Sequence, residues 1–184
     1  MIYLYLILGA MAVIAAANAA AGLPLLTAVG VTALLTAAVI AVDALFALLI
    51  RHLPARWFRY DRRLFRVGHG ESRFYQAIAV KRWKGIVPDL GCFTSFPKQR
   101  LTAPSDPAYT ERYLLEAAYG IVIHAVNIPT GFLILLLLPD YAWTVALPVA
   151  CVNLALSLLP LFLLRSNFPT IARLHRRNLK RSVT

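Results

Sequence analysis

Charged residues are scarce in this sequence, and acidic residues are the scarcest of them. Only 15% of the 184 residues are charged and 60% are hydrophobic, whereas an average soluble domain is about 25% charged and about 45–50% apolar. Long stretches also lack the alternation of core and surface positions that a soluble fold requires. These deficits exclude a disordered protein, a collagen-like fibre, a coiled coil and an ordinary cytosolic enzyme. They leave an all-α integral membrane protein.

The motifs of several familiar chemistries are also absent. Cys92 and Cys151 form neither a metal-binding pair nor a disulfide framework. No H-E-x-x-H, P-loop, G-x-G-x-x-G or G-x-S-x-G motif is present. No histidine is followed four or five positions later by the aspartate of the well-known soluble and glycerolipid acyltransferases. We therefore expect no metal and no cofactor, and any catalytic site must be assembled within the membrane.

Four apolar runs are long enough to cross a hydrocarbon core of about 30 Å, which takes roughly 20 helical residues. The connectors within the first pair and within the last pair are only a few residues long, and such short connectors predict antiparallel neighbours. We predict four transmembrane helices arranged as two hairpins, joined by a long cytoplasmic interfacial loop, in a single membrane domain. The predicted segments are spans at 2–21, 25–50, 113–138 and 142–164, the loop at 51–112 and a basic tail at 165–184.

The basic residues are confined to two blocks. Of the 19 Lys and Arg residues, 13 lie in the loop and 6 in the tail. The positive-inside rule then predicts that the N-terminus, loop and tail are cytoplasmic, at a bacterial inner membrane. Basic blocks separated by apolar runs favour a membrane over nucleic acid as the partner. Ala17-Asn18-Ala19 resembles a signal-peptide cleavage site, but no basic segment precedes it, so we expect the first span to be retained.

Aromatic and basic residues alternate in the first half of the loop, as is typical of segments at the lipid headgroup level. Tyr75, Ile78, Ala79 and Trp83 recur at helical spacing and predict an interfacial helix over 71–83, followed by a turn at 87–91. Membrane lipid is therefore an expected partner. One alternative function follows directly: a non-catalytic membrane module whose basic loop binds anionic lipid or a partner protein.

Ionisable residues inside a span are costly and indicate a functional site by default. In the third span Glu116, Gly120, His124, Asn127 and Gly131 form one polar stripe of low bulk, with His124 about 12 Å deeper than Glu116 by helical rise. The stripe predicts a cavity open to the cytoplasm. The structural alternative for His124 is a hydrogen bond between helices.

Two further polar residues lie in the other spans. Asp43 is roughly two turns inside the second span, and Asn153 lies in the fourth. Asp43 is either catalytic or part of a structural ion pair with His124 or a loop arginine.

The run from Val80 to Asp89 resembles the V-K-x-W-K-D-x-L-P signature of the glycosyl-4,4'-diaponeurosporenoate acyltransferase family, which are small bacterial membrane proteins of carotenoid biosynthesis. The resemblance extends over about 65–177. Gly85, Ile121 and Thr170 depart from the family pattern. The further matches are Phe96-Pro97-Lys98, the spacing of Glu116 and His124, Asn153-Leu154 and Arg165-Ser166-Asn167.

The resemblance implies a transferase that moves a fatty acyl group to a hydroxyl of a glycosylated, carotenoid-like lipid or a similar amphiphilic acceptor. The acyl donor would be acyl-CoA, acyl carrier protein or a phospholipid. His124 would be the general base and Glu116 would orient it or stabilise its cationic form. The expected substrate-binding residues are Lys81, Arg82 and Lys84 for the donor's phosphates or headgroup, Trp83 as interfacial anchor, Asn127, Asn153 and Asn167 for the developing oxyanion, and Arg165.

A small membrane methyltransferase is the second alternative. In it the loop and the arginine-rich tail would hold a nucleotide-like cofactor.

Overall fold

The computed structural model is helical throughout the part of the chain that it describes. Four helical segments are long and apolar enough to cross a membrane, namely Tyr3–Ala20, Leu25–Arg51, Pro107–Leu136 and Pro139–Arg181. They overlap the four apolar runs of the sequence, so the predicted all-helical fold with four long apolar helices is confirmed and is compatible with a multi-pass membrane protein. The residues that are not described are 1, 84, 86, 88–95, 97–100 and 183–184, together with the side chains of Ile2 and Lys81.

The chain divides into two compact units, each made of two stretches of sequence. Unit 1 comprises Met1–Ile50 and Ile123–Leu158, and unit 2 comprises Arg51–Val122 and Leu159–Thr184. The two long helices α5 (Pro107–Thr130) and α6 (Leu147–Arg181) contribute residues to both units.

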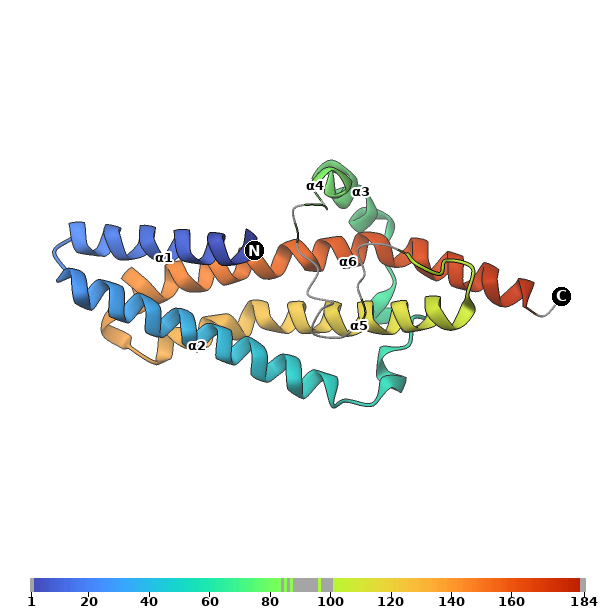
Figure 1. Ribbon diagram of the computed structural model, residues 1–184, viewed down its shortest axis with the longest axis horizontal. Coiled ribbons are helices and arrows are strands. Elements are labelled where there is room, and N and C mark those ends of the chain that lie inside the picture. Colours follow the sequence, from blue (N-terminus) through green and yellow to red (C-terminus); the bar gives the residue numbers. More distant parts are fainter. Residues whose placement is uncertain (1, 84, 86, 88–95, 97–100, 183–184) are drawn as a thin grey trace. The chain divides into compact units, whose positions relative to one another are not determined.

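Unit 1 begins with α1 (Ile2–Ala20) and α2 (Leu25–Arg51), and the chain reverses direction between them (Figure 1). Gly22 has φ +102° in this turn, a conformation that residues with a Cβ rarely adopt. The amide of Gly22 donates to the carbonyl of Ala19 at 3.0 Å, which closes the end of α1. The pairing of the spans into two hairpins stays a prediction.

The second stretch of unit 1 contains an interruption in helix type. Pro129 lies near the end of α5, where its ring removes a backbone donor, and the chain tightens into a 3-10 helix at Gly131–Leu136. A 3-10 turn at Pro139–Tyr141 and a π-helical turn at Ala142–Ala146 then lead into α6. The apolar core of unit 1 consists of Ile14, Leu35, Val39, Ile134, Val145, Ala146, Val149 and Ala150.

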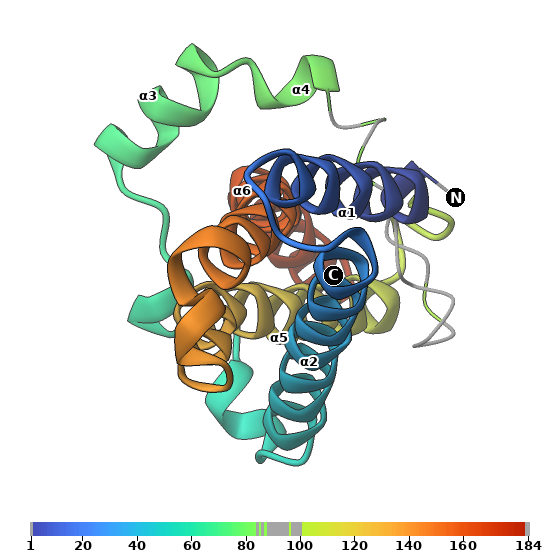
Figure 2. The same ribbon diagram turned by 90° about the vertical axis from the view of Figure 1, so that its left-hand side faces the viewer.

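Unit 2 contains the segment predicted as an interfacial loop. Two 3-10 turns, Ala55–Phe58 and Arg63–Phe65, are followed by α3 (His69–Ala77) and α4 (Val80–Trp83). The prediction of one continuous helix over 71–83 is wrong: the chain breaks between α3 and α4, where Ala79 has φ +50° (Figure 2). The turn expected at 87–91 lies outside the described residues except for Val87, which is buried.

Helix α6 is longer than predicted. Most of the sequence assigned to a basic tail continues the helix to Arg181, although Pro160 and Pro169 lie within it. Helix α5 likewise begins at Pro107, before the predicted start of the third span. Proline at the first helical position is favoured, because its missing amide proton would have no intrahelical partner there.

Candidate functional site

Asp43 of α2, Asn127 of α5 and Asn153 of α6 form a polar cluster in unit 1. The Asn153 Nδ2 atom donates to Asp43 Oδ1 and to the Asn127 backbone carbonyl, both at 3.4 Å, and the Asn127 side chain also hydrogen-bonds to Asp43. No ion pair to Asp43 is found among the described residues. Two amides, those of Asn153 and Asn127, therefore contact this carboxyl group.

Asn127 is the most buried member of this cluster, with 6% of its surface exposed. Its Oδ1 atom has no hydrogen-bond donor in the described part of the chain. An unsatisfied buried acceptor costs free energy in the folded state, of the order of 1–3 kcal/mol. The cluster therefore retains the capacity to accept one more hydrogen bond.

Gly131 explains how Asn153 fits into the cluster. A Cβ atom at position 131 would lie 2.5 Å from Asn153 Nδ2. Only glycine leaves room for the amide here, so the low-bulk stripe predicted along the third span has a packing reason at this position.

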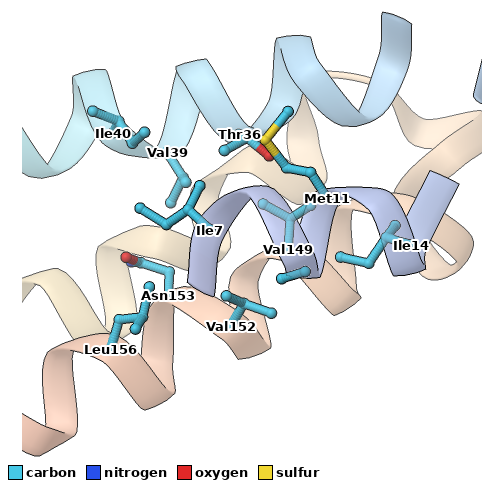
Figure 3. A pocket seen from close by; sticks show the side chains of 11 residues that line it. Ile7, Met11, Ile14, Thr36, Val39, Ile40, Val149, Val152, Asn153 and Leu156 are labelled. Atoms are coloured by element: carbon cyan, nitrogen blue, oxygen red, sulfur yellow. The ribbon is translucent and has the colours of Figure 1, made fainter. Parts of the chain in front are cut away.

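Asn153 also lines a narrow cavity in unit 1 between α1, α2 and α6 (Figure 3). Its volume is about 40 Å³, too small for a sugar or a phosphate group. The remaining lining is apolar except for Thr36, and consists of Ile7, Ala10, Met11, Ile14, Val39, Ile40, Val149, Val152 and Leu156. The cavity is a small apolar space beside one amide of the cluster.

The two candidate catalytic residues of α5 belong to different units. His124, in unit 1, is half-buried and precedes Asn127 by one helical turn. Glu116, in unit 2, accepts a hydrogen bond from Arg51 Nη2 at 3.1 Å, and the Arg51 guanidinium also lies over the Tyr119 ring. The Glu116 carboxylate is thus held by an arginine that the sequence analysis did not connect with it.

Arg165 makes several polar contacts in unit 2. It donates from Nε and Nη2 to both carboxylate oxygens of Glu71, and from Nη1 to the Leu64 carbonyl at 2.8 Å. The hydroxyl of Tyr75 donates to the same carboxylate. The sequence analysis did not predict Glu71 as a site residue. The only feature of the sequence that pointed to it is its spacing of four residues from Tyr75, which places both side chains on one helix face.

These contacts shift the pKa values of Glu71 and Tyr75. The hydrogen bonds from Arg165 lower the pKa of Glu71, because they favour the charged carboxylate. Burial, followed by the hydrogen bond to Glu71, raises the pKa of Tyr75 to about 12. The carboxylate is therefore ionised and the phenol protonated over the neutral range, as the hydrogen bonds require.

Of the remaining predicted substrate-binding residues, three have side chains that the structure describes. Arg82 is exposed, Trp83 donates from its indole nitrogen to the Ile78 carbonyl at 2.9 Å, and Asn167 of α6 is half-buried. The Lys81 side chain and Lys84 lie outside the described structure. No three His, Cys, Asp or Glu side chains come together as metal ligands in the part of the chain that is described.

The four long apolar helices and the polar groups within them are compatible with a small multi-pass membrane protein that has ionisable side chains in its helices. The glycosyl-4,4'-diaponeurosporenoate acyltransferase family matches residues 54–177, more than half of the chain, and the chain belongs to this family. Searches of curated proteins and of solved structures found no match. The family match includes Glu71, Glu116, His124, Asn127, Asn153 and Arg165.

Proposed function

We propose that this protein transfers a fatty acyl group to a hydroxyl of a glycosylated, carotenoid-like lipid. The family match over residues 54–177 carries this proposal. Four apolar helices support it, since an amphiphilic acceptor reaches an enzyme of this kind from within the bilayer. We further propose a bacterial inner membrane location with both termini and the basic segment 51–112 in the cytoplasm.

In the proposed reaction the acceptor's hydroxyl oxygen attacks the acyl carbonyl carbon of the donor. The bond between that carbon and the donor's leaving group breaks, and the hydroxyl proton passes through His124 to the leaving group. The donor is acyl-CoA, acyl carrier protein or a phospholipid. Asn127 and Asn153 bind substrate in this proposal, because the Asn127 Oδ1 atom, which has no donor among the described residues, can accept a hydrogen bond from the attacking hydroxyl.

The other family-matched residues have supporting roles in this proposal. Lys81, Arg82 and Lys84 bind the donor's anionic group, Trp83 anchors their segment at the interface, and Asn167 binds substrate. The Arg165 guanidinium contacts Glu71 and backbone carbonyls, so we assign it to positioning α3. The ion pair with Arg51 supports a secondary role for Glu116.

The test is acyl transfer by purified protein in lipid vesicles, followed by mass spectrometry of the acceptor lipid. His124→Ala is expected to reduce acyl transfer by roughly 10²-fold or more, because the proton acceptor is lost. Glu116→Gln is expected to cost less, since its contribution is positioning and charge support.

The matched control is His52→Ala, which removes an exposed histidine next to Arg51. It is expected to leave the acylation rate unchanged. If His124→Ala instead lowers the thermal stability of the protein while the folded fraction keeps full specific activity, His124 is structural and the catalytic assignment is wrong. If no acylated product forms from a glycosylated acceptor with any of the three donors, the proposed reaction is wrong.

A further inference from the structure

The segment from Pro54 to Phe65 in unit 2 is held at two points by buried phenylalanines. Phe58 is 3% exposed and stacks on Tyr119 of α5 with ring centroids 4.1 Å apart. Phe65 is 2% exposed and stacks on Phe168 of α6. These contacts fix the backbone between them, so the side chains that point outward from this segment are presented in a preformed arrangement.

Those outward side chains form an open groove of about 560 Å³. Trp57 is 53% exposed and Leu64 is 63% exposed. Two large apolar side chains that are exposed next to charged groups contribute little to a core. Such exposure is typical of a surface that binds another molecule. The groove is lined by Trp57, Asp61, Arg62, Arg63 and Leu64.

The charge of the groove is positive. Its one acid, Asp61, is neutralised by Arg59, which donates from Nε and Nη2 to the two carboxylate oxygens at 3.2 and 3.0 Å. Arg62 is held in place by a hydrogen bond from Nη2 to the Arg56 carbonyl, at 3.3 Å. Within the described structure Arg63 has no acidic partner. Two adjacent guanidinium groups are therefore left for an anion.

The groove follows directly after an apolar span. Helix α2 ends at Arg51, and Trp57 comes six residues later. Tryptophan and arginine next to the end of a span are typical of the headgroup level of a bilayer, where an apolar ring and a charged group are both satisfied. Guanidinium groups also bind phosphate oxygens in bidentate fashion.

We propose that this groove binds the headgroup of an anionic phospholipid. Arg62 and Arg63 contact the phosphate, and Trp57 and Leu64 contact the glycerol and the first methylene groups of the acyl chains. This binding site is independent of the proposed acyl transfer, because it uses none of the residues assigned to that reaction.

The test uses tryptophan fluorescence in nanodiscs. Trp83→Phe and Trp143→Phe leave Trp57 as the only tryptophan of the chain. Phosphatidylcholine nanodiscs are supplemented with phosphatidylglycerol or phosphatidylcholine brominated near the glycerol end of the acyl chains, at equal molar fraction. Brominated phosphatidylglycerol is expected to quench Trp57 at least about threefold more strongly, because each arginine near the surface favours anionic lipid.

Two double variants lose the same net charge. Together they distinguish a specific headgroup site from a general electrostatic attraction of the basic protein for anionic lipid. Arg62→Gln with Arg63→Gln is expected to abolish the preference for phosphatidylglycerol. Arg173→Gln with Arg177→Gln, at exposed positions of α6, is expected to preserve it. Circular dichroism and thermal unfolding in detergent verify that both double variants are folded.

Three results would overturn the proposal. One is equal quenching by the two brominated lipids in the unmodified groove, and another is an equal loss of preference in both double variants. The third is a change of Trp57 emission on adding inorganic pyrophosphate, without any preference for phosphatidylglycerol, which would make the groove a site for a soluble phosphate. None of these results depends on whether the protein acylates a lipid.

Discussion

At the scale of single residues, the stripe along α5 and the 3-10 helix that follows it has two glycines whose roles differ. A Cβ at Gly131 would meet the amide of Asn153 at 2.5 Å, whereas a Cβ at Gly120 would meet the terminal Cδ1 of Leu164 at 2.8 Å. Asn153 is tied by hydrogen bonds to Asp43 and Asn127, and the end of a leucine side chain rotates more freely.

Gly131→Ala is therefore expected to destabilise the protein more than Gly120→Ala does. Overpacking at a site that cannot adjust typically costs about 1–3 kcal/mol. The measurement is thermal unfolding of both variants in the same detergent, with acyl transfer assayed alongside. Equal melting temperatures for the two variants would contradict the idea that hydrogen bonds hold the Asn153 amide in place.

The sequence predicts which residues share one face of the third span, but it does not predict which side chains they contact. Helical spacing places Glu116, Gly120, His124, Asn127 and Gly131 on one stripe, and the packing at both glycines agrees with it. Spacing along one helix carries no information about the side chain opposite. The contact of Glu116 with Arg51, 65 residues away, therefore emerges only from the fold.

At the scale of elements, α3 is attached to α6 by the Glu71–Arg165 ion pair, and the Tyr75 hydroxyl donates to the same Glu71 carboxylate from within α3. The pKa of Glu71 is lower in the folded protein than its ordinary value of 4.5, so its contribution to stability is complete above that value. This contribution is lost as the pH falls through the lowered pKa. The pKa of Tyr75 rises from 10.0 to about 12, so its hydrogen bond to Glu71 persists throughout the neutral range.

We accordingly expect the melting temperature of the wild-type protein to exceed that of Glu71→Gln by a constant amount from about pH 6 to pH 9. The difference is expected to shrink as the pH falls below 4.5. Thermal unfolding in detergent across this range measures it, with Glu111→Gln, an exposed acid on α5, as the control. A difference that is unchanged well below pH 4.5 would mean that the ion pair does not attach α3.

Hydropathy predicts the four long helices because a span requires a run of apolar residues, and such a run is visible without any knowledge of partners. The break at Ala79 is not visible in this way, since alanine is a good helix former and its positive φ is imposed by the surroundings. The helical continuation of α6 through 165–181 is also unexpected, because its basic residues resemble a solvated tail.

At the scale of the whole molecule, the distribution of basic residues predicts the orientation in the membrane. The test uses a chain in which Cys92 and Cys151 are replaced by serine and one new cysteine is introduced. Gly22→Cys and Asp140→Cys, in the two short connectors, are expected to react with a membrane-impermeant thiol reagent applied to intact cells. Gln76→Cys, exposed on α3, is expected to react only after the membrane is opened.

Labelling in opened cells controls for accessibility, since all three cysteines should then react. Reaction of Gln76→Cys in intact cells would reverse the predicted orientation. It would also place the basic segment outside the cell, where acyl-CoA and acyl carrier protein, two of the three proposed donors, are not found.

Unit 2 consists of two stretches that are far apart in the sequence, 51–122 and 159–184, and this has a consequence for biosynthesis. Glu71 pairs with Arg165, and the Thr110 hydroxyl lies 3.0 Å from Nδ1 of His175, whose side chain is buried. The ribosome makes Glu71 94 residues before Arg165, a delay of roughly 5–20 s at ordinary elongation rates. During that interval Phe65 also lacks Phe168, the ring on which it stacks in the finished protein. Unit 2 therefore completes its fold only after the last helix has been synthesised, and a nascent chain stalled before residue 165 would expose the aromatic side chains that α6 later covers.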